Sequence, residues 1–170
     1  RQMCIRDSPY TVLSYYNENA AEKDLIQSAF IVMDYTGTVQ AVVGGLGEKP
    51  GDGAFNRATQ ATRSPGSTMK PISTYSLAVQ KNLITYSTLI PDEAINIGTQ
   101  DEPQIWPQNY GEVWGDGTLR TAWYGVQHSL NTLAVRVGRM NTTKAMYTQL
   151  TQMLGFTTLV ESDIALSPLC

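Results

Sequence analysis

Histidine and cysteine are both scarce in this 170-residue chain. His128 is the only histidine, and the two cysteines, Cys4 and Cys170, lie near opposite ends. None of them has the spacing of metal ligands, so the sequence predicts no metal site. Charge is scarce too, since Asp, Glu, Lys and Arg make up 16% of the residues, with a net charge of −3. Without a basic stripe, nucleic acid is not an expected partner.

Long hydrophobic runs are also missing. The apolar runs are short, such as residues 29–33 (AFIVM), whereas a membrane-spanning helix needs about 20 apolar residues. The sequence therefore predicts no membrane segment, and it shows no signal-peptide pattern. Hydrophobic residues still amount to 42%, which is enough for the buried core of one domain or of a large part of one.

The two ends of the sequence do not follow the pattern of the rest. Residues 1–8 (RQMCIRDS) show no periodicity, and we interpret them as a non-native junction or scar. Residues 9–26 are interpreted as a linker. Residues 27–170 are predicted to form one domain, and its last residues, 165–170 (ALSPLC), contain no closing element. We therefore expect this domain to be incomplete.

Strand patterns occur early in the chain. Residues 28–34 and 38–43 are rich in apolar and β-branched types and flank a Tyr-Thr-Gly turn, which predicts a hairpin. Because an isolated hairpin is marginally stable, the sheet is expected to have further strands. Residues 46–62 and 82–117 are rich in glycine, proline or polar residues, and both are predicted to be loops.

Helical spacing of apolar residues dominates the remainder. Thr118 is a candidate N-cap for one helix and Asn141 for another, while Gly155 is expected to end the last helix. Strands followed by helices predict an α/β fold of the segregated, α+β type. The predicted helices cover residues 68–81, 118–129, 132–139 and 141–154.

The motif with the clearest chemistry is residues 65–71 (PGSTMKP). Positions i and i+3 of a helix share a face, so Ser67 and Lys70 are expected to meet. A serine hydroxyl needs a base to become a nucleophile, and burial together with a helix N-terminus favours the neutral lysine that can serve. Alone, however, Ser-x-x-Lys is common on solvated helix faces.

A second motif, Ser129-Leu130-Asn131, follows about sixty residues later. A second hydroxyl near the first could relay a proton from Lys70 to a leaving amine, and the Asn131 amide could bind a peptide carbonyl or hold the lysine. His128 next to Ser129 suggests a Ser-His-Asp triad as an alternative. We disfavour it because Lys70 is already one helical turn from Ser67.

The order Ser-x-x-Lys then Ser-x-Asn is the signature of penicillin-binding proteins and serine β-lactamases. The surrounding sequence resembles the transpeptidase domain of class A penicillin-binding proteins, which fuse a glycosyltransferase to a transpeptidase. The resemblance runs from about residue 27 to residue 156. It rests on residues 33–37 (MDYTG), 41–45 (AVVGG), 55–59 (FNRAT), 63–71 (RSPGSTMKP), 106–110 (WPQNY), 117–120 (GTLR) and 129–136 (SLNTLAVR).

Two departures from that family are visible. Ser64 stands where glutamine is expected, which is a minor change. The third family motif, a Lys-Thr-Gly on a later strand that binds the substrate carboxylate and leads to the second oxyanion-hole N–H, does not occur in the 170 residues. The sequence is therefore interpreted as a fragment, truncated before that strand, of a penicillin-binding or serine β-lactamase-like fold.

The resemblance implies an extracytoplasmic, membrane-anchored parent protein that cross-links peptidoglycan as a D-Ala-D-Ala transpeptidase. Its partners would be stem peptides and lipid-linked glycan strands, with β-lactam antibiotics as inhibitors and no cofactor. The implied catalytic residues are Ser67, Lys70, Ser129 and Asn131.

Two alternatives stay open. One is a serine β-lactamase or D,D-carboxypeptidase, in which water resolves the acyl-enzyme. Leu130 stands where class A β-lactamases have aspartate, and no glutamate follows in their deacylating role, so the sequence disfavours that alternative. The other is an inactive fragment or a non-catalytic module that binds β-lactams or peptidoglycan.

Overall fold

The computed structural model describes residues 27–47 and 51–165. The chain divides into two compact units, residues 1–63 and residues 64–170, and each is described by itself. The predicted junction at residues 1–8 and linker at residues 9–26 lie outside the described residues, as do Cys4 and Cys170.

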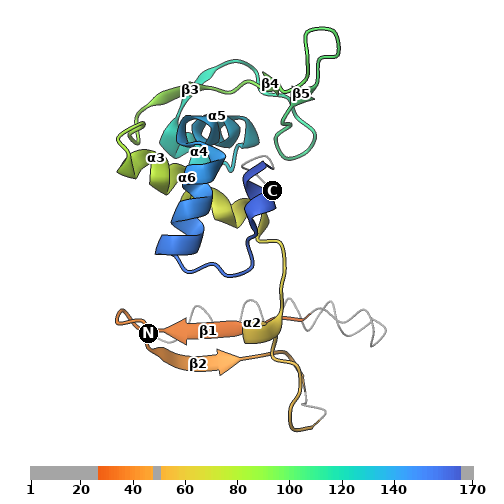
Figure 1. The fold of residues 1–170 in the computed structure, drawn as a ribbon, viewed down its shortest axis with the longest axis vertical. Helices are drawn as coiled ribbons and strands as arrows, with labels where there is room; N and C mark the ends of the chain where they lie inside the picture. The colour runs from red at the N-terminus through yellow and green to blue at the C-terminus, as the bar shows by residue number, and fades with distance from the viewer. Residues whose placement is uncertain (1–26, 48–50, 166–170) are drawn as a thin grey trace. The chain divides into compact units, whose positions relative to one another are not determined.

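The first unit contains the predicted hairpin (Figure 1). Strand β1 (Phe30–Met33) pairs antiparallel with β2 (Val39–Val43), and Phe30 lies opposite Val43. Between the strands, Asp34 Oδ1 accepts hydrogen bonds from the backbone N–H groups of Thr36 at 2.8 Å and Thr38 at 3.0 Å. Every residue of both strands is exposed, and among residues 27–47 and 51–165 this sheet has two strands.

A short helix, α2 (Arg57–Gln60), follows in the segment that was predicted to be a loop. The Asn56 side chain caps it by accepting from Ala58 N at 3.0 Å, and Arg57 N donates to Gly44 O at 2.9 Å. A Cβ at Gly44 would lie 2.6 Å from Asn56 Oδ1. Only glycine therefore allows the end of β2 to approach the cap of α2.

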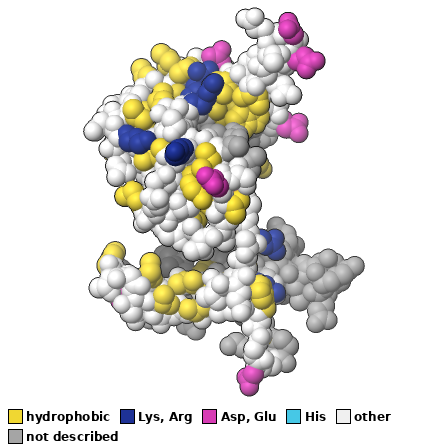
Figure 2. Space-filling model, viewed as in Figure 1, with side chains coloured by type: hydrophobic (Ala, Val, Ile, Leu, Met, Phe, Trp, Pro, Cys, Tyr) yellow, Lys and Arg dark blue, Asp and Glu magenta, His cyan; other side chains and the backbone are white. Residues whose placement is uncertain are grey.

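The second unit is built around helix α5 (Asn131–Asn141), which packs against α3 (Ser76–Gln80), α4 (Ala122–Gln127), α6 (Thr143–Thr148) and the π-helix Lys70–Tyr75 (Figure 1). Strand β3 (Leu89–Pro91) also contacts α5. The surface of this unit keeps many apolar side chains (Figure 2). Its core consists of Tyr75, Ala78, Ile84, Ile90, Ala122, Leu133, Ala134 and Val137.

The segment predicted to be a helix over residues 68–81 is helical from residue 68 to residue 80 but is not one α-helix. It starts as the 3-10 helix Gly66–Met69, continues as the π-helix Lys70–Tyr75 and ends as α3. Pro71 lies at the start of the π-helix, where its missing N–H leaves no unpaired donor. Short π-helical segments are frequent at functional sites.

The prediction of a helix over residues 118–129 is wrong for its first turn. Leu119–Thr121 forms strand β6, which pairs antiparallel with β3, and Thr121 rather than Thr118 caps α4 by accepting from Tyr124 N at 3.2 Å. Strand pairing outweighs local helical spacing here, because Ile90 of β3 belongs to the buried core. The segment 82–117 is likewise not a pure loop, since β4 (Ile95–Asn96) pairs with β5 (Ile105–Trp106).

The last helix begins one residue later than predicted. Asn141 ends α5, is buried, and donates from Nδ2 to Thr74 O at 2.7 Å. Thr142, with a φ of +72°, caps α6 instead, and the π-helix Gln149–Met153 extends it. Gly155, with a φ of +70°, follows that end as predicted.

Replacing Gly125 of α4 by alanine should destabilise the second unit. The new Cβ would lie 2.7 Å from Leu133 Cδ2 and 2.8 Å from Tyr75 Oη, both in the core. Overpacking costs about 1–3 kcal/mol, which is as large as or larger than the ~1 kcal/mol that alanine gains over glycine in helix propensity. Urea unfolding followed by tryptophan fluorescence measures this, because all three tryptophans lie in the second unit. An unchanged or raised midpoint would contradict this packing.

Candidate active site

Ser67 is the second residue of the 3-10 helix Gly66–Met69, and its side chain is exposed. Gly66 has a φ of +54°, a left-handed conformation that favours glycine, and it ends the Pro-Gly turn. The prediction that Ser67 lies at the start of a helix is thus confirmed. At this position the Ser67 backbone N–H has no partner within the helix and is free to bind an oxyanion.

Lys70 is buried, with 7% of its surface exposed. Its Nζ donates to Ser129 O at 2.7 Å, to Ser129 Oγ at 3.2 Å and to Asn131 Oδ1. Ser129 and Asn131 lie 59 and 61 residues after Lys70 in the sequence. The prediction that they approach the Lys70 amine is therefore confirmed as geometry. Burial also lowers the pKa of Lys70 from its ordinary value, which favours the neutral amine.

The predicted contact between Ser67 and Lys70 is not among the hydrogen bonds of the described residues. Within the described part of the chain, the hydrogen bonds of Lys70 Nζ go to Ser129 and Asn131 and none goes to Ser67 Oγ. The lysine amine is therefore engaged by the Ser-x-Asn motif in this structure. Its transfer of a proton from Ser67 stays a prediction.

Ser129 owes its place to an unusual backbone. With a φ of +52° it lies in the left-handed region, between the end of α4 and the start of α5. Leu130 N then donates to Gly125 O at 3.0 Å, which closes the turn. This tight reversal brings both the carbonyl and the hydroxyl of Ser129 onto the same lysine amine.

Three oxygens surround the Lys70 amine, which matches the three N–H donors of an ammonium group. A neutral amine has two N–H donors and one lone pair, and Ser129 O and Asn131 Oδ1 can only accept. In the neutral form these two oxygens would bind the two N–H groups, and the lone pair would be left to a hydroxyl. Ser129 Oγ, at 3.2 Å, is the contact that can also donate. Proton transfer from a hydroxyl to Lys70 therefore requires the neutral amine.

His128 does not form a triad with Ser67. Its ring stacks on Tyr124, with the ring centroids 3.9 Å apart and the planes at 27°. Its backbone N–H donates to Tyr124 O at 2.9 Å. His128 is thus an exposed residue at the end of α4.

Sequence reasoning missed the residues that hold Asn131. Asn131 Nδ2 donates to Gln108 O at 2.7 Å, and Asn131 N donates to Asn109 Oδ1 at 2.8 Å. Both partners lie in the WPQNY segment, which was noted only for its resemblance. The buried Asp92 accepts in turn from Asn109 Nδ2 at 3.1 Å. Nothing in the sequence around Asp92 indicates this role.

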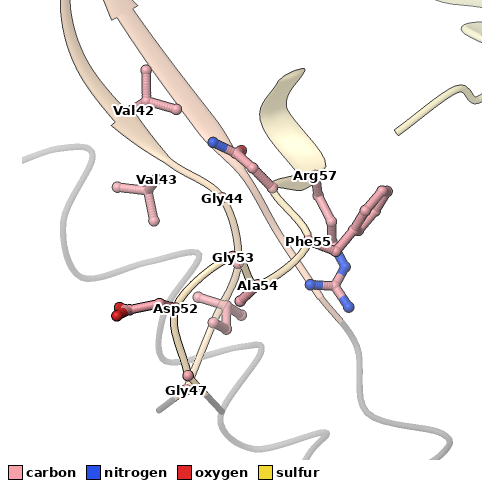
Figure 3. A pocket seen from close by; sticks show the side chains of 13 residues that line it. Val42, Val43, Gly44, Gly47, Asp52, Gly53, Ala54, Phe55 and Arg57 are labelled. Atoms are coloured by element: carbon pink, nitrogen blue, oxygen red, sulfur yellow. The ribbon is translucent and has the colours of Figure 1, made fainter. Parts of the chain in front are cut away.

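Figure 3 shows a hollow in the first unit, lined by β2, the glycine-rich turn after it and the start of α2. The guanidinium of Arg57 lies 5.9 Å from the centre of the Phe55 ring. The hollow contains none of the four predicted site residues. Within residues 27–47 and 51–165, no cluster of three potential metal ligands occurs and no helix is long and apolar enough to cross a membrane.

A family model described as "Penicillin binding protein transpeptidase domain" matches residues 27–165. The chain therefore belongs to the penicillin-binding transpeptidase family, and the fold class expected from the sequence is confirmed.

The similar proteins narrow the class further. Penicillin-binding protein 1A of Neisseria lactamica is 40% identical over 120 residues, which are 68% of this chain and 14% of that protein. Penicillin-binding protein 1A of Aquifex aeolicus is 34% identical over 131 residues, 75% of this chain and 17% of that protein. The crystal structure of Penicillin-Binding Protein 1A from Haemophilus influenzae matches with a TM-score of 0.59 and 28% identity, over 77% of this chain and 19% of that chain. The chain thus corresponds to a segment of a class A transpeptidase domain, and it spans less than a fifth of the length of these relatives.

Proposed function

We propose that this chain carries the nucleophile and the base of a D-Ala-D-Ala transpeptidase that cross-links peptidoglycan stem peptides. Ser67 is the nucleophile, Lys70 its base, Ser129 a proton relay and Asn131 the residue that orients the lysine. The observation that carries the proposal is the buried Lys70 amine held by both residues of the Ser-x-Asn motif.

The chemistry follows from these positions. Lys70 takes the proton of Ser67 as Oγ attacks the penultimate D-Ala carbonyl, so a C–O bond forms and the oxyanion lies near the Ser67 N–H. The peptide C–N bond then breaks, and the terminal D-Ala leaves with a proton passed from Lys70 through Ser129. An amine of a neighbouring stem peptide then attacks the acyl-enzyme, so a new peptide C–N bond forms, the ester C–O bond breaks and a proton of the amine returns to Ser67 Oγ.

The proposal includes partners and a location. Stem peptides on lipid-linked glycan strands would be the substrates, and β-lactams would acylate Ser67 as inhibitors. The parent protein would be anchored in the membrane and act at its extracytoplasmic face, where these strands are assembled. The names of the relatives, Penicillin-binding protein 1A, support this setting.

The test is to locate the penicillin adduct by peptide mass spectrometry. The protein used is the extended protein, meaning these residues in a longer form that includes a Lys-Thr-Gly strand. We expect one adduct, on Ser67, and none on Ser64 or Thr68, which are exposed hydroxyl residues in the same turn. An adduct elsewhere, or none, would refute the assignment of Ser67 and leave the non-catalytic alternative.

The same sample decides between acyl transfer and hydrolysis. Retention of the adduct after excess penicillin is removed is expected of a transpeptidase, since water resolves its acyl-enzyme poorly. Fast loss of the adduct would favour the β-lactamase or carboxypeptidase alternative.

A further inference from the structure

A continuous set of hydrogen bonds runs from a buried carboxylate to the lysine of the site. Asp92, 5% exposed, accepts from Asn109 Nδ2 at 3.1 Å, and Asn109 Oδ1 accepts from Asn131 N at 2.8 Å. Asn131 Oδ1 then accepts from Lys70 Nζ. In the described part of the chain neither Asp92 nor Asn109 is hydrogen-bonded to Lys70, and Asn131 is the residue that links them to it.

The direction of each amide in this set is fixed by a partner that can only accept. A carboxylate cannot donate, so Asp92 forces the Asn109 amide to present Nδ2 to it and Oδ1 to α5. The carbonyl of Gln108 cannot donate either and accepts from Asn131 Nδ2 at 2.7 Å. Asn131 must therefore turn Oδ1 toward Lys70. With the Asn131 amide flipped, its N–H donors would face the Lys70 amine, and its Oδ1 would face the Gln108 carbonyl oxygen.

The set is anchored on several sides. Asp92 also accepts from Thr132 Oγ1 at 2.6 Å and from Arg120 Nε at 3.0 Å. Asn109 N is fixed by donating to Val113 O at 2.8 Å. Since Thr132 follows Asn131 directly, Asp92 and Asn109 hold the first turn of α5 at two adjacent residues.

We propose that Asn109, held by Asp92, is a positioning residue that fixes the backbone of Asn131 at the start of α5. With the side-chain amide of Asn131 bound to the Gln108 carbonyl, this places Asn131 Oδ1 at the Lys70 amine. The inference rests on the proposed function, because a position matters for catalysis only if Lys70 is the base. A base displaced by about 1 Å can lose about 10² in rate. Asn109 is thus expected to affect the acylation step and not the binding of the β-lactam.

The first experiment measures amide hydrogen exchange by NMR on the 170-residue chain. Asn109→Ala should speed exchange at the N–H groups of Asn131 and Thr132 at least about fivefold, since both lose their acceptor. The matched control is Asn96→Ala, because Asn96 Oδ1 also accepts from two backbone N–H groups, those of Gly98 and Gln104. That variant should leave Asn131 exchange unchanged. Unchanged exchange in Asn109→Ala would overturn the proposal.

The second experiment measures penicillin acylation kinetics on the extended protein. Asn109→Ala should lower the limiting acylation rate about 10²-fold, with the half-saturating penicillin concentration unchanged, whereas Asn96→Ala should change neither. The swapped pair Asp92→Asn with Asn109→Asp restores one donor facing one carboxylate and should recover part of the rate lost by Asn109→Asp alone.

The outcomes separate the two proposals. Faster exchange with an unaltered limiting rate would mean that Asn109 is only structural and would overturn the positioning role. A parent protein that is not acylated at Ser67 would overturn the proposed function and, with it, the catalytic part of this inference. The exchange data would still decide whether Asn109 holds Asn131.

Discussion

In the extended protein, Lys70→Ala should slow acylation by penicillin about 10²–10⁴-fold, which is the usual contribution of a general base. The Ser67 hydroxyl would remain, but no group would take its proton. Stopped-flow or gel-based measurement of acylation rates gives the result. The control is Lys81→Ala, because Lys81 lies eleven residues on and its amine also binds a backbone carbonyl, Asn141 O at 3.3 Å. Lys81→Ala should leave the rate unchanged.

The pH dependence adds a second readout for the same residue. Burial lowers the pKa of Lys70 below 10.5, so the fraction of neutral amine, and with it the acylation rate, should rise with pH and level off above the lowered pKa. The unfolded chain binds this proton more readily than the folded chain, so burial of Lys70 costs stability at lower pH, and the cost fades as pH rises toward 10.5. The pH-dependent rise in rate should vanish in Lys70→Ala. If it persists, another group is the base.

The second large effect concerns the Lys-Thr-Gly motif, which does not occur in the 170 residues. We expect these residues alone to react with a fluorescent penicillin far more slowly than the extended protein. One oxyanion donor, the Ser67 N–H, is present, and loss of the other lowers the rate about 10²–10³-fold. Loss of the carboxylate-binding lysine and threonine misplaces the ligand and removes about 10² more.

Three samples test this expectation: the 170-residue chain, the extended protein and its Ser67→Ala variant. Strong labelling is expected in the extended protein alone, and Ser67→Ala should abolish it. Labelling of the 170-residue chain at the full rate would show that its site needs no further strand. The exposed apolar strands β1 and β2 also make this chain a candidate for aggregation, so its monomeric state is checked first by light scattering.

Local sequence was sufficient where local chemistry decides the structure. The hairpin was predicted because a glycine-containing turn and β-branched residues act over a few positions, and Ser67 was placed at a helix start because Pro65-Gly66 cannot continue a helix from upstream. The pairing of the two motifs predicted that Lys70, Ser129 and Asn131 would meet, and the hydrogen bonds of Lys70 agree.

Tertiary structure decided the features that depend on distant partners. Leu119–Thr121 has helical spacing but forms a strand, because β3 supplies a ladder that no local pattern contains. The amine of Lys70 binds Ser129 and Asn131, because the turn between α4 and α5 and the first residue of α5 each bring an acceptor oxygen to it. Asp92 and Asn109, which lie between β3 and β6, hold the first turn of α5 at Asn131 and Thr132. A sequence pattern can nominate reactive residues, but the orientation of an amide depends on which acceptors the folded chain brings beside it.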